Sequence, residues 1–250
     1  MDELELLIDL HVRNDRQGPG CDEATRRAIE LARLEPSPEL RIADLGCGTG
    51  ASALVLAGEL RAHVTAVDAA PAFIERLQSR ADQEGLGGQV HAQVGDIESP
   101  DFGDRHFDVV WSEGAIYNIG FEAGARNWSR LLKPGGILAV TELSWTTAQR
   151  PDEVERHWRD EYPGIATPSA KLGMLERLGY EPIAMFFLPE HCWTKNYYQP
   201  LAAGFSTFLD RHGNSPQARA LVEAERSEIA LFERFGRWYG YAFYIARWSP

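Results

Sequence analysis

The sequence predicts an α/β fold built on a doubly wound, mostly parallel sheet of seven strands, with an antiparallel last strand and a helical cap. Three observations support this prediction. From Arg41 onward, short apolar runs alternate with helical stretches, which is the pattern of βαβ units. Glycines follow the first strand at Gly46, Gly48 and Gly50, where open parallel sheets bind ligands. The chain then closes on an aromatic strand that follows a long helical excursion.

Two amphipathic helices are expected within residues 1–35. The helical spacing of apolar positions in "DELELLIDLH" predicts the first helix, with a stripe of Leu4, Leu7, Ile8 and His11. Asp22 is the predicted N-cap of the second helix. The apolar stripe of that helix comprises Ala24, Ala28, Leu31 and Ala32.

The core of the sheet is expected within residues 41–145. Alternating apolar runs predict strands at 41–46, 63–69, 89–96, 107–114 and 137–145. Helical patterns between them predict helices at 51–60, 71–85 and 121–132. Pro71 suits a first helical turn and Gly85 a helix end, so the helix at 71–85 has both boundary signals.

Residues 146–250 are expected to form the substrate side of the same single domain, 1–250. Helices are predicted at 150–164 and 167–180, and strands at 181–189 and 239–248. A mainly helical insert, about 191–236, separates those two strands. An antiparallel pair would then finish the sheet, and the insert would lie over one sheet edge as a cap.

Composition limits the classes of function. The chain has 250 residues, 44% hydrophobic and 25% charged, which is ordinary for a globular protein. No apolar run approaches the roughly 20 residues of a membrane span, and the acidic start "MDELELLIDL" lacks a secretion signal, so we expect a cytoplasmic protein. The formal net charge of −12 disfavours nucleic acid as a partner. Cys21, Cys47 and Cys192 are odd in number and far apart, so neither a disulfide framework nor a metal-ligand cluster is expected.

The glycine turn "ADLGCGTG" fits two ligand classes. Gly46, Gly48 and Ala51 fit the dinucleotide fingerprint G-x-G-x-x-G/A, whereas a D-x-G-x-G-x-G pattern beginning at Asp44 fits methyltransferases. Asp68, at the end of the second strand, stands where either class holds ribose hydroxyls. These residues alone leave both classes open.

Three further features favour a sulfonium cofactor over a dinucleotide. Asp44 would repel a pyrophosphate inside the turn, and it would attract the α-ammonium group of S-adenosylmethionine. Asp96 follows the third strand, from where its carboxylate can accept a hydrogen bond from an adenine amino group. The segment "RLLKPGGILAV" before the fifth strand is a turn typical of one family.

Residues 41–145 resemble the class I S-adenosylmethionine-dependent methyltransferases, especially the group around the ubiquinone and menaquinone methyltransferases. The resemblance rests on five segments in the family's order: "DLGCGTG", "VTAVDAA", "VGDIE", "FDVVWSEGAIYNIG" and "LLKPGG". The flanks "RQGPG", "WSEGAIYNIGF" and "LPEHCWT" also resemble an uncharacterised bacterial branch of that family. The long aromatic C-terminal insert departs from the quinone enzymes, so their substrate is not carried over.

The resemblance implies a Rossmann-like methyltransferase fold, S-adenosylmethionine as cofactor, and cofactor contacts in chain order. The glycine turn would lie under the methionine part, the second strand would hold the ribose, the third would bracket the adenine, and the fourth would line the floor near the sulfonium. The implied residues are Asp44, Gly46, Cys47, Gly48 and Gly50 in the turn, Asp68 and Ala69, Asp96 and Ile97, and Glu113 and Gly114. "RQGPG" would fold over the cofactor, with Arg16 or its glycines near the carboxylate, and Cys47 is expected to be a half-buried thiol rather than a nucleophile.

The acceptor side is predicted from two aromatic stretches and the end of the fifth strand. Methyl transfer needs alignment of the acceptor and exclusion of water, and it needs a general base only for a protonated acceptor. The candidate catalytic residues are His191, Tyr117 and Glu142. The candidate substrate-binding residues are Tyr117, Asn118, Trp145, Trp193 and Tyr197. Structural alternatives stay open: an ion pair for Glu142, core packing for the aromatic residues, and a structural role for His191.

The leading hypothesis is an S-adenosylmethionine-dependent methyltransferase acting on a compact, neutral or cationic small molecule, without a metal. The alternatives are methylation of RNA or protein, a nicotinamide-dependent oxidoreductase, and a non-catalytic module that binds a partner through the cap. The oligomeric state is open, with a homodimer among the alternatives.

Overall fold

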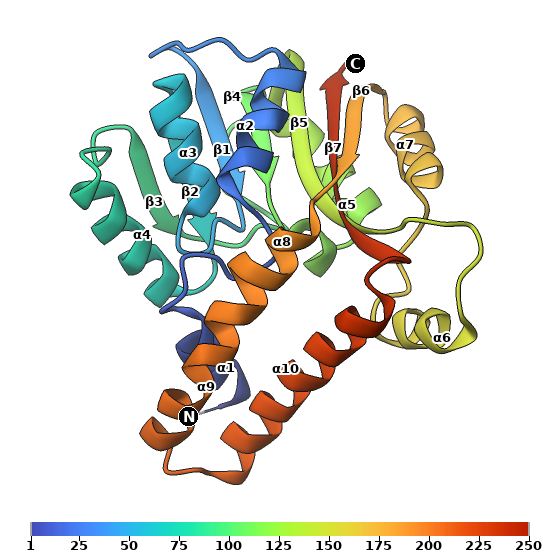
Figure 1. The fold of residues 1–250 in the computed structure, drawn as a ribbon. Helices are drawn as coiled ribbons and strands as arrows, with labels where there is room; N and C mark the ends of the chain where they lie inside the picture. Colours follow the sequence, from blue (N-terminus) through green and yellow to red (C-terminus); the bar gives the residue numbers. More distant parts are fainter. Residues whose placement is uncertain (1, 250) are drawn as a thin grey trace.

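The structure is a computed structural model that describes residues 2–249, and it confirms the predicted doubly wound α/β fold (Figure 1). Its sheet has seven strands in the order β3-β2-β1-β4-β5-β7-β6. They are β1 (Arg41–Leu45), β2 (His63–Asp68), β3 (Val90–Val94), β4 (Phe107–Ser112), β5 (Leu132–Trp145), β6 (Tyr180–Phe187) and β7 (Tyr239–Trp248). β7 runs antiparallel to both β5 and β6, whereas the pairs among β1 to β5 are parallel. The predicted antiparallel last strand is therefore confirmed.

The strand order reverses at β1, and this reversal positions the ligand site. β1 pairs with β2 on one side and with β4 on the other. Open parallel sheets bind ligands beyond the carboxyl ends of the strands at such a point. The chain leaves β1 directly into the glycine turn, so the turn lies where the fold favours a ligand.

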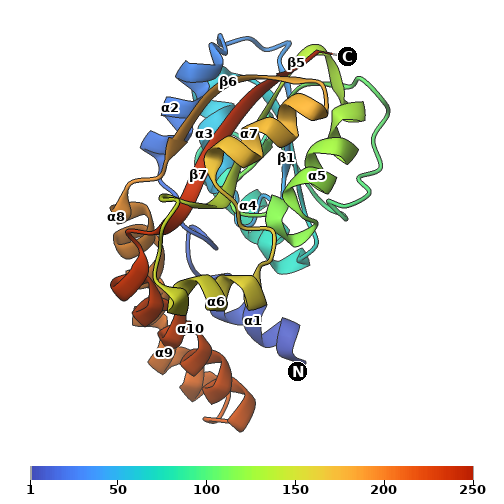
Figure 2. The same ribbon diagram turned by 90° about the vertical axis from the view of Figure 1, so that its right-hand side faces the viewer.

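Helices cover both faces of the sheet. One face carries α2 (Asp22–Ala32), α3 (Ala51–Leu60) and α4 (Pro71–Gln83), and the other carries α5 (Phe121–Trp128) and α7 (Pro168–Arg177) (Figure 2). α3 packs against both α2 and β2, and seven of its ten residues are buried. This double packing explains the almost continuously apolar sequence of α3.

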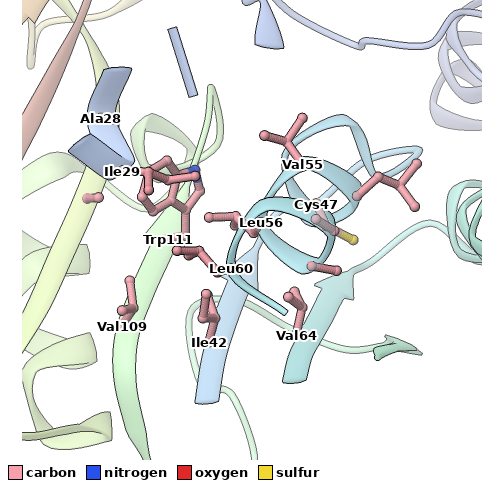
Figure 3. Close-up of a cluster of buried hydrophobic side chains, with 14 of the residues drawn as sticks. Ala28, Ile29, Ile42, Cys47, Val55, Leu56, Leu60, Val64, Val109 and Trp111 are labelled. Atoms are coloured by element: carbon pink, nitrogen blue, oxygen red, sulfur yellow. The ribbon is translucent and has the colours of Figure 1, made fainter. Parts of the chain in front are cut away.

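The core between the sheet and α3 anchors the glycine turn (Figure 3). Ile42 of β1 and Trp111 of β4 pack in one cluster with Leu56 and Leu60 of α3, and none of the four is more than 1% exposed. Burial of a large apolar side chain contributes about 1.5–3 kcal/mol. Since β1 and α3 flank the turn, this packing holds both of its ends.

The cap lies beyond the carboxyl ends of the parallel strands (Figures 1 and 2). It comprises α1 (Glu3–His11), α6 (Asp152–Glu161), α8 (Glu190–Trp193), a π-helical segment (Thr194–Tyr198), α9 (Gln199–Arg211) and α10 (Pro216–Phe235). These elements, with the ends of β5 and β7, bury a third hydrophobic cluster of their own. The cap therefore has its own core and faces the ligand edge of the sheet.

The predicted apolar stripe of α1 is right at His11, which is 6% exposed, and wrong at Leu4 and Leu7. Leu4 and Leu7 are 63% and 37% exposed, whereas Leu6 and Leu10 are each 5% exposed. α1 packs against α9 and α10, and the i, i+4 pair Leu6 and Leu10 is the pair that faces them. Only the fold shows which of the two apolar faces has a partner.

The N-cap of α2 also differs from the prediction. Cys21, not Asp22, is the capping residue, and its Sγ accepts the N–H of Ala24 at 3.4 Å. Asp22 is instead the first residue of the helix, where a negative charge is favourable beside the helix dipole. Among the described residues, no helix combines the length and the apolar composition that a membrane crossing requires.

Candidate functional site

The glycine turn adopts backbone conformations and close contacts that side chains would prevent. Gly46, Gly48 and Gly50 have φ angles of 77°, 53° and 91°. A Cβ on Gly46 would lie 2.2 Å from Cβ of Ala115, and one on Gly50 would lie 2.0 Å from Cδ1 of Leu77. The turn is therefore wedged between α4 and the loop that follows β4. Cys47, inside the turn, is 5% exposed, and burial raises the pKa of its thiol well above the ordinary value.

Residues 12–21, here called the strap, lie over this turn. Oε1 of Gln17 accepts the N–H of Thr49 at 2.8 Å, and a Cβ on Gly48 would come within 2.2 Å of the same oxygen. Nη1 of Arg80 donates to the carbonyl oxygens of Thr49 and Asp15, at 3.0 and 3.1 Å. The segment "RQGPG" is thus in direct contact with the glycine turn through Gln17.

Asp44 is a fully buried carboxylate with an unsatisfied oxygen. Its Oδ2 accepts a hydrogen bond from Oγ of Ser52 at 2.7 Å, while Oδ1 has no hydrogen-bond partner within residues 2–249. The pKa of Asp44 is raised to about 7, mainly by burial and also by the nearby carboxylates of Glu113 and Asp68. A buried carboxylate of this kind favours a cationic group nearby.

Asp68 ties the end of β2 to the glycine turn. Its Oδ2 accepts the N–H of Gly48 at 2.9 Å, and its Oδ1 accepts the N–H of Ala70 at 3.0 Å. Burial raises the pKa of this carboxyl, although the backbone hydrogen bonds oppose the shift. Each ionised oxygen keeps a further lone pair, so both can still accept a hydroxyl hydrogen.

The residues expected around an adenine lie at the next two strand ends. Ala69 and Asp96 are exposed, and Ile97 is half-buried. Oδ1 of Asp96 accepts the N–H of Glu98 at 2.8 Å, and an ionised carboxylate keeps further lone pairs for another donor. The carbonyl oxygen of Ile97 accepts Nε1–H of Trp128 at 2.7 Å, which holds this loop against α5. Ala69, Asp96 and Ile97 thus have the exposure that a bound base would need.

Glu113, at the end of β4, contacts the strap and α2. Its Oε2 accepts from Nη1 of Arg16 at 3.3 Å, and its Oε1 accepts from Oγ1 of Thr25 at 2.7 Å and Nε1 of Trp111 at 3.0 Å. The side chain is only 7% exposed. These contacts make Glu113 a link between β4 and the strap. Gly114, with φ of 71°, has no heavy atom within 4 Å of the place where a Cβ would stand.

Among the aromatic residues predicted for the acceptor side, Tyr117 is the most exposed. It is 39% exposed, and its ring packs edge-on against Tyr162 with 6.0 Å between centroids. Burial raises the pKa of the Tyr117 hydroxyl, and the carboxylates of Glu228 and Glu142 raise it further. Tyr117 therefore stays protonated and neutral. Asn118, beside it, is exposed, and its Nδ2 donates to the carbonyl oxygen of Ala115 at 3.0 Å.

Glu142 forms a fully buried ion pair. Nζ of Lys171 lies 2.9 Å from Oε1 of Glu142, and both side chains are 0% exposed. The same ammonium donates to the carbonyl oxygen of Gly164 at 3.1 Å and lies 4.6 Å from the centre of the Phe121 ring. Burial raises the pKa of Glu142 and lowers that of Lys171, and the attraction between them opposes both shifts. These contacts are those of a structural pair that joins β5 to α7.

Three predicted substrate-binding residues pack within the cap cluster. Trp193 stacks on Phe232 at 4.5 Å between ring centres, and Tyr197 stacks on His11 at 6.2 Å. Trp145 lies under the guanidinium of Arg150 at 4.0 Å. All three are less than 10% exposed.

Although the cysteines are far apart in the sequence, two of them meet a histidine in the fold. Cys21, Cys192 and His191 place their sulfur and nitrogen ligand atoms within 4.8 Å of one another. A hydrogen bond with Cys192 is the largest cause that lowers the pKa of Cys21 to about 6, and His191 contributes to the same direction. Sequence distance concealed this cluster because α8 and the N-terminus of α2 meet only in the fold. His191, predicted as a base, is exposed beside these thiols.

Sequence reasoning missed several residues at the site: Gln17, Thr49, Arg80, Tyr162 and Lys171. Gln17 lies in "RQGPG" and Thr49 in the glycine turn, and turns of this kind leave backbone N–H and C=O groups that need hydrogen-bond partners. The other three come from helices and from the loop before α7, where no local pattern marks them.

Comparison with known proteins identifies the central part of the chain. Residues 42–136 match the family described as a methyltransferase domain. The uncharacterized methyltransferase YodH of Bacillus subtilis is 34% identical over 123 residues, which are 49% of this chain and 52% of that protein. The glycine/sarcosine/dimethylglycine N-methyltransferase of Actinopolyspora halophila is 29% identical over 73% of this chain and 33% of its own. This chain thus spans about half the length of the first relative and a third of the second.

A solved structure with the same fold covers nearly the whole chain. The S-adenosylmethionine-dependent methyltransferase from Geobacter sulfurreducens, in complex with S-adenosyl-L-homocysteine, has a TM-score of 0.81 and 21% identity. The match covers 96% of each chain. The predicted fold is confirmed, and the methyltransferase class predicted from the sequence agrees with the domain that residues 42–136 match.

Proposed function

We propose that this chain is a class I S-adenosylmethionine-dependent methyltransferase that transfers a methyl group to a small-molecule acceptor held between the glycine turn and the cap. One observation carries the proposal: the turn touches the loop that bears Tyr117. A Cβ on Gly46 would lie 2.2 Å from Cβ of Ala115, two residues before Tyr117. The donor side and the acceptor side are therefore neighbours.

The residues at the strand ends suit S-adenosylmethionine. Asp44 offers a buried oxygen without a partner among the described residues, which favours the α-ammonium group. Asp68 keeps lone pairs for the ribose hydroxyls, and Asp96 with Ile97 would bracket the adenine. When bound, the cofactor supplies a methyl group on a positively charged sulfur. The chain's own part is to orient the acceptor and exclude water, and such alignment can lower a barrier by roughly 7–11 kcal/mol.

The strap would close the donor side from solvent. Gln17 contacts the turn, and Arg16 is held by Glu113 at 3.3 Å and Asp22 at 2.9 Å. Through these contacts the strap spans from the turn to β4. It therefore stands where it can exclude water from the donor side.

The acceptor would be compact and would need no proton removal by the protein. Tyr117 stays protonated, so it offers a ring face and a hydrogen-bond donor rather than a base. Glu142 is neutralised by Lys171, and His191 lies beside Cys21 and Cys192. The carboxylate of Glu228 acts on Tyr117 without a cation as close as the one that Glu142 has in Lys171, so this side favours a molecule that is uncharged or carries a positive charge away from the reacting atom.

A transfer experiment tests this proposal. Purified protein is incubated with methyl-labelled S-adenosylmethionine and, separately, with pools of small amines, phenols and thiols, with RNA, and with protein extract. Label should enter a small molecule only, and Asp68→Ala should abolish it. Tyr117→Phe is the matched variant on the acceptor side and should lower turnover while leaving cofactor affinity unchanged. Label in RNA or protein, or equal losses of turnover and affinity in Tyr117→Phe, would contradict the proposal.

The subgroup around the quinone methyltransferases, the cytoplasmic location and the homodimer are further predictions from the sequence. The relative from Actinopolyspora halophila methylates amines by its name, which supports testing the amine pool first.

A further inference from the structure

We propose that Cys21, His191 and Cys192 form a zinc-binding site that joins the strap to the cap. Their ligand atoms lie within 4.8 Å of one another. Cys21 ends the strap at the N-cap of α2, and the other two residues are neighbours on α8. The site is separate from the proposed methyl transfer and does not depend on it.

The backbone holds the two halves of this site together. The N–H of Gly20 donates to the carbonyl oxygen of Cys192 at 3.3 Å. Nδ2 of Asn196, one turn further along, donates to the carbonyl oxygen of Gly20 at 3.0 Å. Two hydrogen bonds thus fix the strap against α8 directly beside the ligand atoms, so little rearrangement is needed before a metal binds.

The donor set matches the chemistry of zinc. Two thiolate sulfurs and one imidazole nitrogen are ligands that Zn²⁺ prefers, with distances of about 2.3 Å to sulfur and about 2.0 Å to nitrogen. Three protein ligands leave a fourth tetrahedral position for water. Binding releases the thiol protons, and the two thiolate charges balance the dication, so no net charge is added among buried residues.

The surroundings allow an ion to enter. The residues Cys21 and Cys192 are 2% and 0% exposed, whereas His191 is exposed. A cavity of about 570 Å³ opens beside Cys21 and is also lined by Asp22, Glu23 and Asn196. The lining also carries Arg13, Arg16, Arg80 and Lys195, so the cavity offers an ion a route to the thiols rather than an electrostatic attraction toward them.

Zinc at this site would stabilise the strap in its observed place. The strap contacts the glycine turn through Gln17 and α8 through Gly20. A metal that binds only the folded arrangement raises its stability by mass action. We therefore expect zinc to raise the melting temperature of the protein with or without cofactor.

Titration of the reduced full-length protein with Zn²⁺ against a chromophoric chelator tests the proposal, with Co²⁺ as the spectroscopic probe. One equivalent of metal should bind, and Co²⁺ should give a thiolate charge-transfer band and a tetrahedral spectrum. Cys21→Ser is the key variant because serine is a good N-cap and preserves the start of α2. It should remove the charge-transfer intensity of one thiolate and weaken zinc binding more than about tenfold, and His191→Gln should weaken it similarly. Cys47→Ser, in the glycine turn and outside the cluster, should leave zinc affinity unchanged.

Several results would overturn the proposal. These are less than a tenth of an equivalent of zinc bound by the reduced protein, unchanged affinity in Cys21→Ser and His191→Gln, or an equal loss in Cys47→Ser. A Cys21–Cys192 disulfide in the purified protein, with no metal bound after its reduction, would also overturn it. Cooperative unfolding in urea and far-ultraviolet circular dichroism report folding of each variant independently of the metal.

Discussion

Asp44 gives the sharpest prediction about stability. Its carboxyl is fully buried, and its pKa is about 7 against 3.8 for an ordinary aspartate. At about 1.36 kcal/mol per pKa unit, this difference makes the ionised folded state roughly 4 kcal/mol less favourable than it would be with an ordinary pKa. The unfolded chain loses this proton near pH 3.8 and the folded chain near pH 7, so the contribution of Asp44 to stability falls as pH rises between these values.

Asp44→Asn removes this titration while keeping the shape and an oxygen for the hydroxyl of Ser52. Proton binding is linked to folding, so the two pKa values set how stability depends on pH. Between about pH 5 and about pH 8, the free energy of unfolding of the wild type should fall by roughly 2.5 kcal/mol relative to that of the variant. The cost of burying an amide without a partner is the same at both pH values and cancels from this comparison.

Urea denaturation of both proteins across this pH range, without cofactor, measures the difference. Ser52→Ala serves as the control, because it removes the hydrogen bond to Asp44 but keeps the carboxyl. Losing this bond should raise the pKa of Asp44 and steepen the pH dependence. Parallel pH profiles for wild type and Asp44→Asn would refute the reasoning, because they would mean that Asp44 titrates alike in the folded and unfolded states.

Three other substitutions test the site. Asp68→Ala removes the acceptors of the N–H groups of Gly48 and Ala70. Calorimetry should show at least about tenfold weaker binding of S-adenosyl-L-homocysteine, by a protein that still unfolds cooperatively. Unchanged affinity would show that the ribose lies elsewhere. Lys171→Met leaves Glu142 buried without its partner, so the free energy of unfolding measured in urea should fall by about 3–5 kcal/mol. The double variant Lys171→Met, Glu142→Leu should recover most of this loss. Gly50 has a φ of 91°, and a Cβ there would lie 2.0 Å from Leu77, whereas a Cβ on Gly58 in α3 would meet open space. Gly50→Ala should therefore destabilise the protein more than Gly58→Ala. Equal melting temperatures would contradict the tight packing of the turn.

The sequence predicted the sheet and the turn well because both are coded locally. Asp44, Gly46 and Asp68 lie within or directly beside strands whose apolar runs are unambiguous, and parallel strands bring their carboxyl ends to one edge. Their positions follow once the strands are placed in order. The three turn glycines all have positive φ angles, a backbone conformation that glycine adopts without steric strain.

The cap was harder to predict because its contacts join distant segments. α1 has two apolar faces, and the choice of Leu6 over Leu7 depends on α9 and α10, which lie at the other end of the chain. Trp193 and Tyr197 could equally line a site or fill a core, and only the rings of Phe232 and His11 stacked on them show the packing.

The cysteine cluster shows the same limit. Cys21 and Cys192 carry no spacing signal, because no short motif links the N-cap of one helix to another helix far along the chain. Lys171 likewise reveals its role only when α7 packs beside β5 and brings it to Glu142.

Calorimetric titration of the purified protein with S-adenosylmethionine, S-adenosyl-L-homocysteine and NAD, in parallel, shows whether the glycine turn holds a sulfonium cofactor or a dinucleotide. The glycine turn, Asp44 and Asp68 predict micromolar binding of both sulfur ligands, one per chain, and no binding of NAD. Binding of NAD alone, or of none of the three ligands, would contradict the account.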